Sequence, residues 1–166
     1  MPTIVIVEGV DRSGKTTVAN TLSRVLNIPV FRNKEFGFND EDHGRGAVYE
    51  TQKMWLMLNM IETLDADVIL DRFHLSEYVY GMIERGYINN NVWKIDERLA
   101  SLNAIIVHVR PYDIESSSLL HGKDLTEYED AFECISDYTT NCDVVTGTML
   151  DVDKIVHDVQ ELIQKK

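Results

Sequence analysis

The chain has 166 residues, of which 44% are hydrophobic and 27% are charged, and its formal net charge is −12. This length fits one domain with its own core, and the composition is ordinary for a soluble globular protein. A surface this acidic repels a nucleic-acid backbone, and the only cluster of cations is Lys165-Lys166. A small phosphorylated metabolite is therefore the expected partner, and nucleic acid is not.

The apolar runs are short, such as residues 104–107, so no membrane-spanning segment is predicted. Met1-Pro2-Thr3 leads directly into the first apolar run and leaves no room for a signal peptide. The two cysteines, Cys134 and Cys142, suit a reducing compartment. These features predict a cytoplasmic protein.

The first predicted elements are a strand over residues 3–8 and a helix over residues 15–25. Between them the sequence reads Gly-x-x-x-x-Gly-Lys-Thr, and we name residues 9–16 the phosphate loop. Its glycines let the backbone fold around an anion, and the helix adds the positive end of its dipole. The lysine can reach the outer phosphates, and the threonine hydroxyl can ligate Mg²⁺. The predicted phosphate ligands are Gly9, Ser13, Gly14, Lys15, Thr16 and Thr17.

The rest of the chain alternates between β-branched runs and stretches with helical periodicity. Further strands are predicted over residues 28–32, 67–70, 104–109 and 143–146. Further helices are predicted over residues 47–64, 75–84, 92–102 and 126–138, and after Asp151 as a cap. This pattern predicts a single α/β domain over residues 1–166, with a five-stranded parallel sheet in three layers.

Three of these elements carry finer predictions. The strand at 28–32 opens on Pro29, which suits an edge strand. Apolar residues surround most of the helix at 47–64, which predicts burial on more than one side. Thr126 and Glu129 have the spacing of a capping box, and residues 112–125 before them are predicted to form a loop.

Polar side chains end several of the predicted strands. Asp71-Arg72 follows the third strand, Arg32 ends the second, and Arg110 ends the fourth. Ligands of open parallel sheets lie at the carboxyl ends of the strands. An aspartate there can hold Mg²⁺ through water, and an adjacent arginine can clamp the phosphate of an acceptor.

Two stretches together resemble the thymidylate kinase family. Residues 8–17, EGVDRSGKTT, resemble its phosphate loop of the type with an internal arginine. Residues 71–81, DRFHLSEYVYG, look like its Asp-Arg-Tyr-x-x-Ser-x-x-Ala-Tyr signature. The resemblance implies a three-layer P-loop kinase fold that transfers the γ-phosphoryl of ATP to a deoxynucleoside monophosphate, with dTMP to dTDP as the expected reaction in nucleotide biosynthesis.

By position, the resemblance implies that Lys15 binds the donor phosphates and that Thr16 and Asp71 hold Mg²⁺, partly through water. Arg12 would stabilise charge on the transferring group, so Lys15, Arg12 and Asp71 are the expected catalytic residues. Asp11 would bind the sugar 3′-hydroxyl and Arg72 the acceptor phosphate. The full expected acceptor set is Asp11, Arg72, Arg32, Glu35, Trp55 and Tyr80.

The expected lid, residues 112–125, contains no arginine, and Lys123 is its only cation. In the other type of this family the catalytic arginine comes from the lid. The arginine in the phosphate loop and the lack of one in the expected lid therefore both fit the type of the family with an internal arginine.

The acceptor side departs from the family pattern. Met60 stands about where an arginine belongs, Trp55 or Leu56 stands where the aromatic before it belongs, and Phe36 replaces a phosphate-contacting arginine. The acceptor base thus stays open, and so do three alternatives. These are a deoxynucleoside kinase with Glu35 as its base, a kinase of a hydroxymethylated base in DNA, and a nucleotide-binding switch. The apolar excess of residues 47–64 is also compatible with a homodimer.

Overall fold

The computed structural model describes residues 1–32, 46–112, 119–120, 123–139 and 141–166. Its main sheet has five strands, all parallel, in the order β2-β3-β1-β4-β7. The strands are β1 (Ile4–Glu8), β2 (Val30–Arg32), β3 (Val68–Asp71), β4 (Ile105–Arg110) and β7 (Asp143–Thr148). The α/β class and the parallel five-stranded sheet are confirmed, and β2 lies at an edge, as Pro29 indicated.

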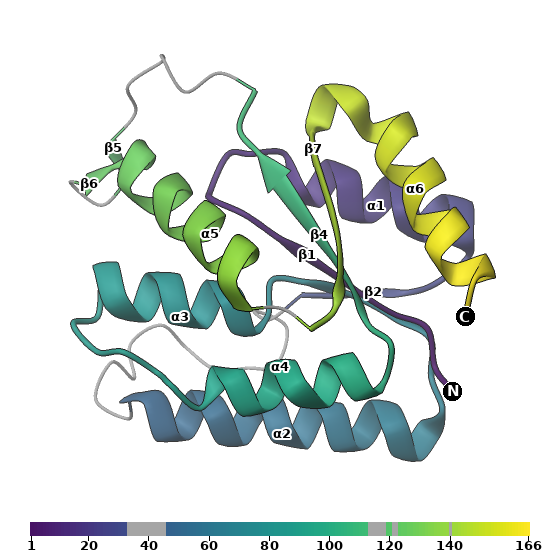
Figure 1. Ribbon diagram of the computed structural model, residues 1–166, viewed down its shortest axis with the longest axis horizontal. Coiled ribbons are helices and arrows are strands. Elements are labelled where there is room, and N and C mark those ends of the chain that lie inside the picture. The colour runs from purple at the N-terminus through teal and green to yellow at the C-terminus, as the bar shows by residue number, and fades with distance from the viewer. Residues whose placement is uncertain (33–45, 113–118, 121–122, 140) are drawn as a thin grey trace.

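Helices cover both faces of this sheet (Figure 1). One face carries α1 (Lys15–Leu26) and α6 (Val152–Gln164). The other face carries α2 (Gly46–Leu64), α3 (His74–Ile83), α4 (Val92–Ser101) and α5 (Leu125–Thr139). The result is the three-layer arrangement expected from the alternating pattern.

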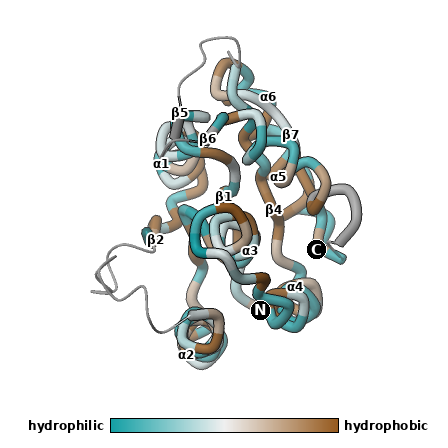
Figure 2. Tube along the Cα trace, turned by 90° about the vertical axis from the view of Figure 1, so that its left-hand side faces the viewer, coloured by the Kyte–Doolittle hydropathy of each residue, from teal (hydrophilic) through white to brown (hydrophobic). Residues whose placement is uncertain are grey.

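The two apolar cores follow from the alternation of side chains along the strands. In β1, Ile4 and Ile6 face α2–α5, whereas Val5 and Val7 face α1 and α6. The neighbouring strand β4 alternates in the same way and is apolar through most of its length (Figure 2). Strands buried on both faces are typical of parallel sheets.

The strand register brings three carboxyl ends together. Val7 of β1 pairs with Asp71 of β3, and Glu8 pairs with His108 of β4. The same end of the sheet, where the strands have their carboxyl ends, therefore carries the phosphate loop after β1, Arg72 after β3 and Arg110 at the end of β4.

The predicted burial of α2 on more than one side is wrong. Four residues on one face are buried, Met54, Met57, Leu58 and Ile61. Four apolar residues on the outer face are exposed, Val48, Leu56, Met60 and Leu64. The helix contacts α3 and α4 from one side only among the described elements, so an apolar circumference did not produce burial all round.

The predicted loop at 112–125 contains a short antiparallel pair, β5 (Leu119–Leu120) and β6 (Lys123–Asp124). The capping box at Thr126 is also wrong, because α5 begins one residue earlier. The Asp124 carboxylate accepts the Thr126 amide at 2.9 Å, and this bond lowers the pKa of Asp124. Glu129 is buried instead of reaching back to the cap.

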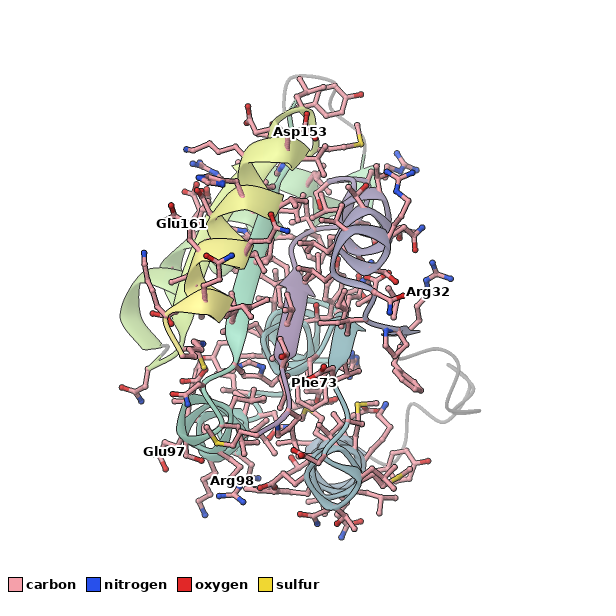
Figure 3. The ribbon with its side chains drawn as sticks, turned by 90° about the vertical axis from the view of Figure 1, so that its right-hand side faces the viewer. Arg32, Phe73, Glu97, Arg98, Asp153 and Glu161 are labelled. Carbon is pink, nitrogen blue, oxygen red and sulfur yellow. The ribbon has the colours of Figure 1, made fainter. Side chains whose placement is uncertain are left out.

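Asp151 precedes α6 as predicted, but its carboxylate accepts the Thr148 hydroxyl at 2.9 Å and makes no side-chain bond to the helix. The outer side of α6 is acidic, with Asp153 and Glu161 pointing to solvent (Figure 3). No helix in the described part of the chain combines the length and the apolar character that a bilayer span requires.

Candidate active site

The phosphate loop has the backbone geometry of an anion cradle. Gly9 has φ 140° and Gly14 has φ 91°, conformations that side chains disfavour. A Cβ on Gly9 would lie 2.3 Å from the Val109 carbonyl oxygen, so the loop packs directly on β4. Helix α1 begins without a side-chain cap, which leaves its first amides available to an anion. Ser13 Oγ is buried and has no hydrogen-bond partner among the described residues.

Lys15 lies almost completely buried at the start of α1. Its Nζ donates to the Val10 carbonyl within the phosphate loop. Burial lowers the pKa of Lys15 to about 8, against the fields of Asp71, Glu8 and Glu129, which raise it. A bound phosphate would replace water around this ammonium group and favour its charged form.

Thr16 and Asp71 face one another across the carboxyl ends of β1 and β3. Thr16 Oγ1 donates to Asp71 Oδ2 at 3.3 Å, and Arg32 Nε lies 3.6 Å from the same oxygen. Among the described residues, no three acidic, histidine or cysteine side chains gather around a point that could hold a metal. A hydroxyl and one carboxylate fit Mg²⁺ that takes its other ligands from phosphates and water.

Asp11 of the phosphate loop forms one cluster with Arg72 and Tyr80. Arg72 Nη2 pairs with Asp11 Oδ1, and its guanidinium carbon lies 5.2 Å from the centroid of the Tyr80 ring. The Tyr80 hydroxyl accepts the Asp11 amide at 3.1 Å. Burial raises the pKa of Tyr80 to about 12, so the phenol is neutral at physiological pH. The fold thus joins three of the residues expected on the acceptor side.

Two arginines at this end of the sheet have left-handed backbones, Arg12 with φ 67° and Arg72 with φ 71°. Such conformations are uncommon outside glycine and often occur at functional sites. Arg12 is exposed and forms no ion pair with another described residue. Its guanidinium is free to meet a ligand.

Glu8, the last residue of β1, holds the start of α3 in place. It is fully buried, and its Oε1 accepts the amides of Phe73 at 2.9 Å, Leu75 at 3.1 Å and Ser76 at 3.3 Å. Its Oε2 accepts the Ser76 hydroxyl. The carboxylate therefore satisfies the first amides of α3 and fixes the segment that follows Arg72.

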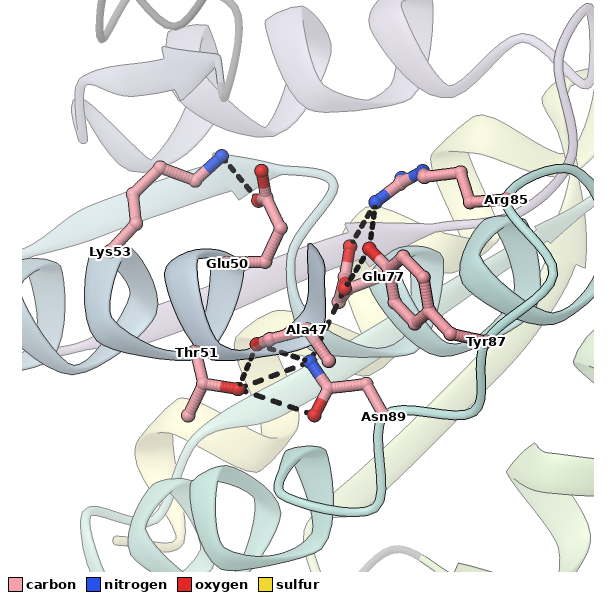
Figure 4. A network of polar contacts seen from close by, with 8 residues as sticks. All are labelled: Ala47, Glu50, Thr51, Lys53, Glu77, Arg85, Tyr87 and Asn89. Carbon is pink, nitrogen blue, oxygen red and sulfur yellow. Dashed lines mark hydrogen bonds and ion pairs between the residues drawn. The ribbon is translucent and has the colours of Figure 1, made fainter. Parts of the chain in front are cut away.

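A second polar network holds α3 against α2 (Figure 4). Glu77 accepts bonds from Arg85 at 2.6 Å, Tyr87 at 2.8 Å and Asn89 at 3.2 Å. Asn89 also donates to the Ala47 carbonyl at 3.1 Å, at the start of α2. Two residues after Arg72, His74 Nε2 lies 3.0 Å from Asp96 Oδ1 of α4, and both side chains are buried.

The sequence reading missed these buried polar residues. Two signals for them are visible in the chain. Glu8 continues the inward-facing series of Ile4 and Ile6, and Asp96 falls between the apolar positions Ile95 and Leu99 of its helix. A charged residue at an apolar position indicates a buried partner.

Among the described residues, the structure does not bring the remaining expected acceptor and lid residues into the Asp11–Arg72–Tyr80 cluster. Trp55 is partly buried and packs against the core beneath α2. Glu35 and most of the lid lie outside the described residues, and Lys123 falls in β6. The role of these residues in acceptor binding stays a prediction.

No family model and no curated protein matches this sequence. Solved structures do match, each over nearly the whole of both chains. The YorR protein from Bacillus subtilis, in complex with phosphorylated GDP, has a TM-score of 0.72 at 21% identity, covering 98% of this chain and 96% of its own.

A thymidylate kinase from Ehrlichia chaffeensis has a TM-score of 0.60 at 19% identity, with 98% of both chains covered. A deoxyadenosine kinase from M. mycoides, with dCMP and dCDP bound, has a TM-score of 0.63 at 12% identity, covering 99% of this chain and 100% of its own. These similarities show that the chain has the fold of P-loop nucleoside and nucleotide kinases, as the resemblance implied.

Proposed function

We propose that this protein is a thymidylate kinase-like enzyme that uses ATP to phosphorylate a deoxynucleoside monophosphate, most directly dTMP to dTDP. The observation that carries the proposal is the position of the Asp11–Arg72–Tyr80 cluster at the phosphate loop. One set of groups suits the donor phosphates, and a second suits a sugar hydroxyl and an acceptor phosphate. The fold shared with nucleoside and nucleotide kinases supports the same reaction class.

The resemblance to thymidylate kinases assigns each group a role that suits its chemistry. Lys15 and the first amides of α1 would bind the donor phosphates, and Arg12 would stabilise charge on the transferring phosphoryl group. Thr16 and Asp71 would hold Mg²⁺, which neutralises phosphate charge when bound. Arg72 would leave Asp11 to grip the acceptor phosphate, freeing the carboxylate for the sugar. Phosphoryl transfer needs such positioning more than covalent chemistry.

Comparing acceptors tests this proposal. Purified protein with ATP and Mg²⁺ is incubated with dTMP, dCMP, dGMP, dAMP or thymidine, and nucleotide products are separated by chromatography. We expect a diphosphate product, formed fastest from dTMP. Turnover of thymidine alone would indicate a deoxynucleoside kinase, and ATP hydrolysis that no acceptor stimulates would indicate a nucleotide switch.

Three wider expectations belong to this proposal. We take residues 1–166 as one kinase domain with its lid at 112–125, and we place its reaction in the cytoplasm. The exposed apolar face of α2 supports pairing of two copies. Sedimentation of the wild type and of a Leu56→Glu variant would test this homodimer.

A further inference from the structure

A cluster of charged side chains outside the groups assigned above joins β4 to α5. Arg110 ends β4, and Glu129 and Glu133 lie one turn apart on α5. Arg110 Nε lies 3.5 Å from Glu129 Oε1, and Arg110 Nη2 pairs with Glu133 Oε1. His108, two residues earlier on the same face of β4, has its Nε2 3.6 Å from Glu129 Oε1.

Glu129 is the unusual member of this cluster. It is 2% exposed, and neither of its carboxylate oxygens has a hydrogen-bond partner within the described ranges. A buried carboxylate without hydrogen bonds is costly, so it depends on nearby cations. Arg110 supplies one, because its Nε lies 3.5 Å from Glu129 Oε1. The charge of Glu129 is also among the fields that raise the pKa of Lys15.

The backbone also places Arg110 at the phosphate loop. The carbonyl of Val109, the preceding residue, lies where a Cβ on Gly9 would be 2.3 Å away. Arg110 thus starts beside the first glycine of the loop. Its side chain is 46% exposed and that of Glu133 is 40% exposed, so solvent reaches this ion pair.

A nucleotide polyphosphate can compete for such an arginine. An exposed ion pair contributes little to stability, because solvent screens it. Arginine binds phosphate through two parallel, charge-assisted hydrogen bonds, which are stronger than an exposed carboxylate pair. The negative charge of the phosphates would also repel Glu133.

We propose that Arg110 is a further ligand of the donor's phosphates, held by Glu133 until a nucleoside triphosphate displaces that carboxylate. The inference rests on the proposed function of the phosphate loop. Binding of the triphosphate then loosens the contact between α5 and β4, and Glu133 acts as a competitor of the nucleotide. Removing the arginine and removing its carboxylate should therefore change nucleotide affinity in opposite directions.

Calorimetric titration of the full chain with ATP and Mg²⁺ tests this opposition. Arg110→Gln should weaken binding by about tenfold or more, as expected for loss of a charge-assisted phosphate contact. Glu133→Gln should tighten binding by about two- to fivefold, since it removes an exposed competitor. Thermal unfolding of each variant is measured in parallel, because Arg110→Gln also leaves Glu129 with one cation fewer.

Arg98 and Glu62 supply the matched control. They form an exposed arginine–glutamate pair between α4 and α2, and Arg98 lies on the outside of α4 (Figure 3). Arg98→Gln and Glu62→Gln should leave ATP affinity unchanged.

Unchanged affinity in Arg110→Gln, or weaker binding in both Arg110→Gln and Glu133→Gln, would overturn the inference and leave Arg110 as a partner of the buried carboxylate. Lys15→Ala separates this failure from the larger one. If Lys15→Ala binds ATP as tightly as the wild type, the proposed function itself fails, and this inference fails with it.

Discussion

The two faces of the sheet are built from different side chains. Apart from the phosphate loop and Asp71, which accepts the Thr16 hydroxyl, the described residues buried under α1 and α6 are apolar, such as Val5, Val107 and Ile155. The face under α2–α5 buries polar side chains among its apolar ones, and they come from the sheet, from its helices and from the loop before α4: Glu8, His74, Ser76, Glu77, Asn89, Asp96, His108 and Glu129. Both faces have an apolar core, so burial of apolar surface alone does not explain the difference.

The polar face fixes where helices lie relative to one another. Apolar packing is non-directional, whereas a buried hydrogen bond specifies one geometry and is costly when it is lost. Glu8 joins β1 to α3, and His74 joins α3 to α4 through Asp96. The helices held in this way carry or flank Arg72 and Tyr80. Apolar packing on both faces supplies stability, and the polar contacts under α2–α5 also fix the position of the site.

The largest effect is expected at the loop where the two faces meet. Arg12→Ala should lower turnover by about 10³-fold, because a finger-type arginine acts on charge that develops in the transition state. ATP affinity should change much less, since an interaction made mainly in the transition state contributes to turnover more than to ground-state binding. Steady-state kinetics and calorimetry measure the two quantities. Equal losses in both would contradict the transition-state role.

The polar face itself is tested at Asp96. Asp96→Ala removes the partner of His74 Nε2 and of the Asn141 amide, and should lower the free energy of unfolding by about 3 kcal/mol. Because His74 lies two residues after Arg72, the KM for dTMP should rise more than the KM for ATP.

The exposed neighbour Glu97 on the same helix is the control for Asp96 (Figure 3). Glu97→Ala should stay within about 0.5 kcal/mol of the wild type. A loss of stability in Asp96→Ala with both KM values unchanged would mean that the polar face does not position the acceptor.

The affinity for nucleotide should depend on pH because Lys15 is buried. Lys15 has a pKa of about 8, and a bound phosphate favours its charged form. Above about pH 8 binding must therefore take up a proton, and ADP affinity should fall towards tenfold for each further pH unit. Below about pH 8 the lysine is already charged, and affinity should level off. Calorimetry between about pH 7.5 and 9.5 covers this window.

Lys15→Arg is the control for the pH dependence, because a guanidinium stays charged throughout this range. Its affinity should be independent of pH. Parallel pH profiles for the wild type and the variant would assign the effect to another group.

The smallest effect is expected on the apolar face. Ile155 of α6 is 1% exposed and packs within that face, so Ile155→Val should lower the free energy of unfolding by about 1 kcal/mol. Chemical denaturation measures this, and both KM values should match those of the wild type. A changed KM for dTMP would show that the division between the faces is not real.

The sequence predicted the fold well where local signals and packing agree. The strand before the phosphate loop is apolar on both faces, and the loop glycines can be placed by their spacing, so β1, the loop and α1 were all expected. Asp71 and Arg72 were found because they end a strand that neighbours β1.

The predictions from the sequence are wrong or incomplete where contacts between residues far apart in the chain determine the structure. Thr126 and Glu129 fit a local capping rule, but Asp124 takes the cap and Glu129 turns towards Arg110 of β4. Apolar residues around the whole of α2 lead to burial only where other elements pack against each side of the helix. The periodicity of the sequence does not show how many elements do so. Glu8 is the last residue of β1, and its place in the sequence does not reveal that its carboxylate accepts the amides of Phe73 and Leu75 at the start of α3.

Transfer of radiolabel tests the central claim most directly. Wild-type protein is mixed with ATP labelled at the γ-phosphate, Mg²⁺ and dTMP, beside a Lys15→Ala variant whose circular dichroism matches the wild type. We predict label in dTDP with the wild type and a loss of at least about 10³-fold in the variant, as expected when a phosphate-binding charge is removed from a phosphoryl-transfer site. Label found only in inorganic phosphate, or equal transfer by the variant, would contradict a kinase built on this loop.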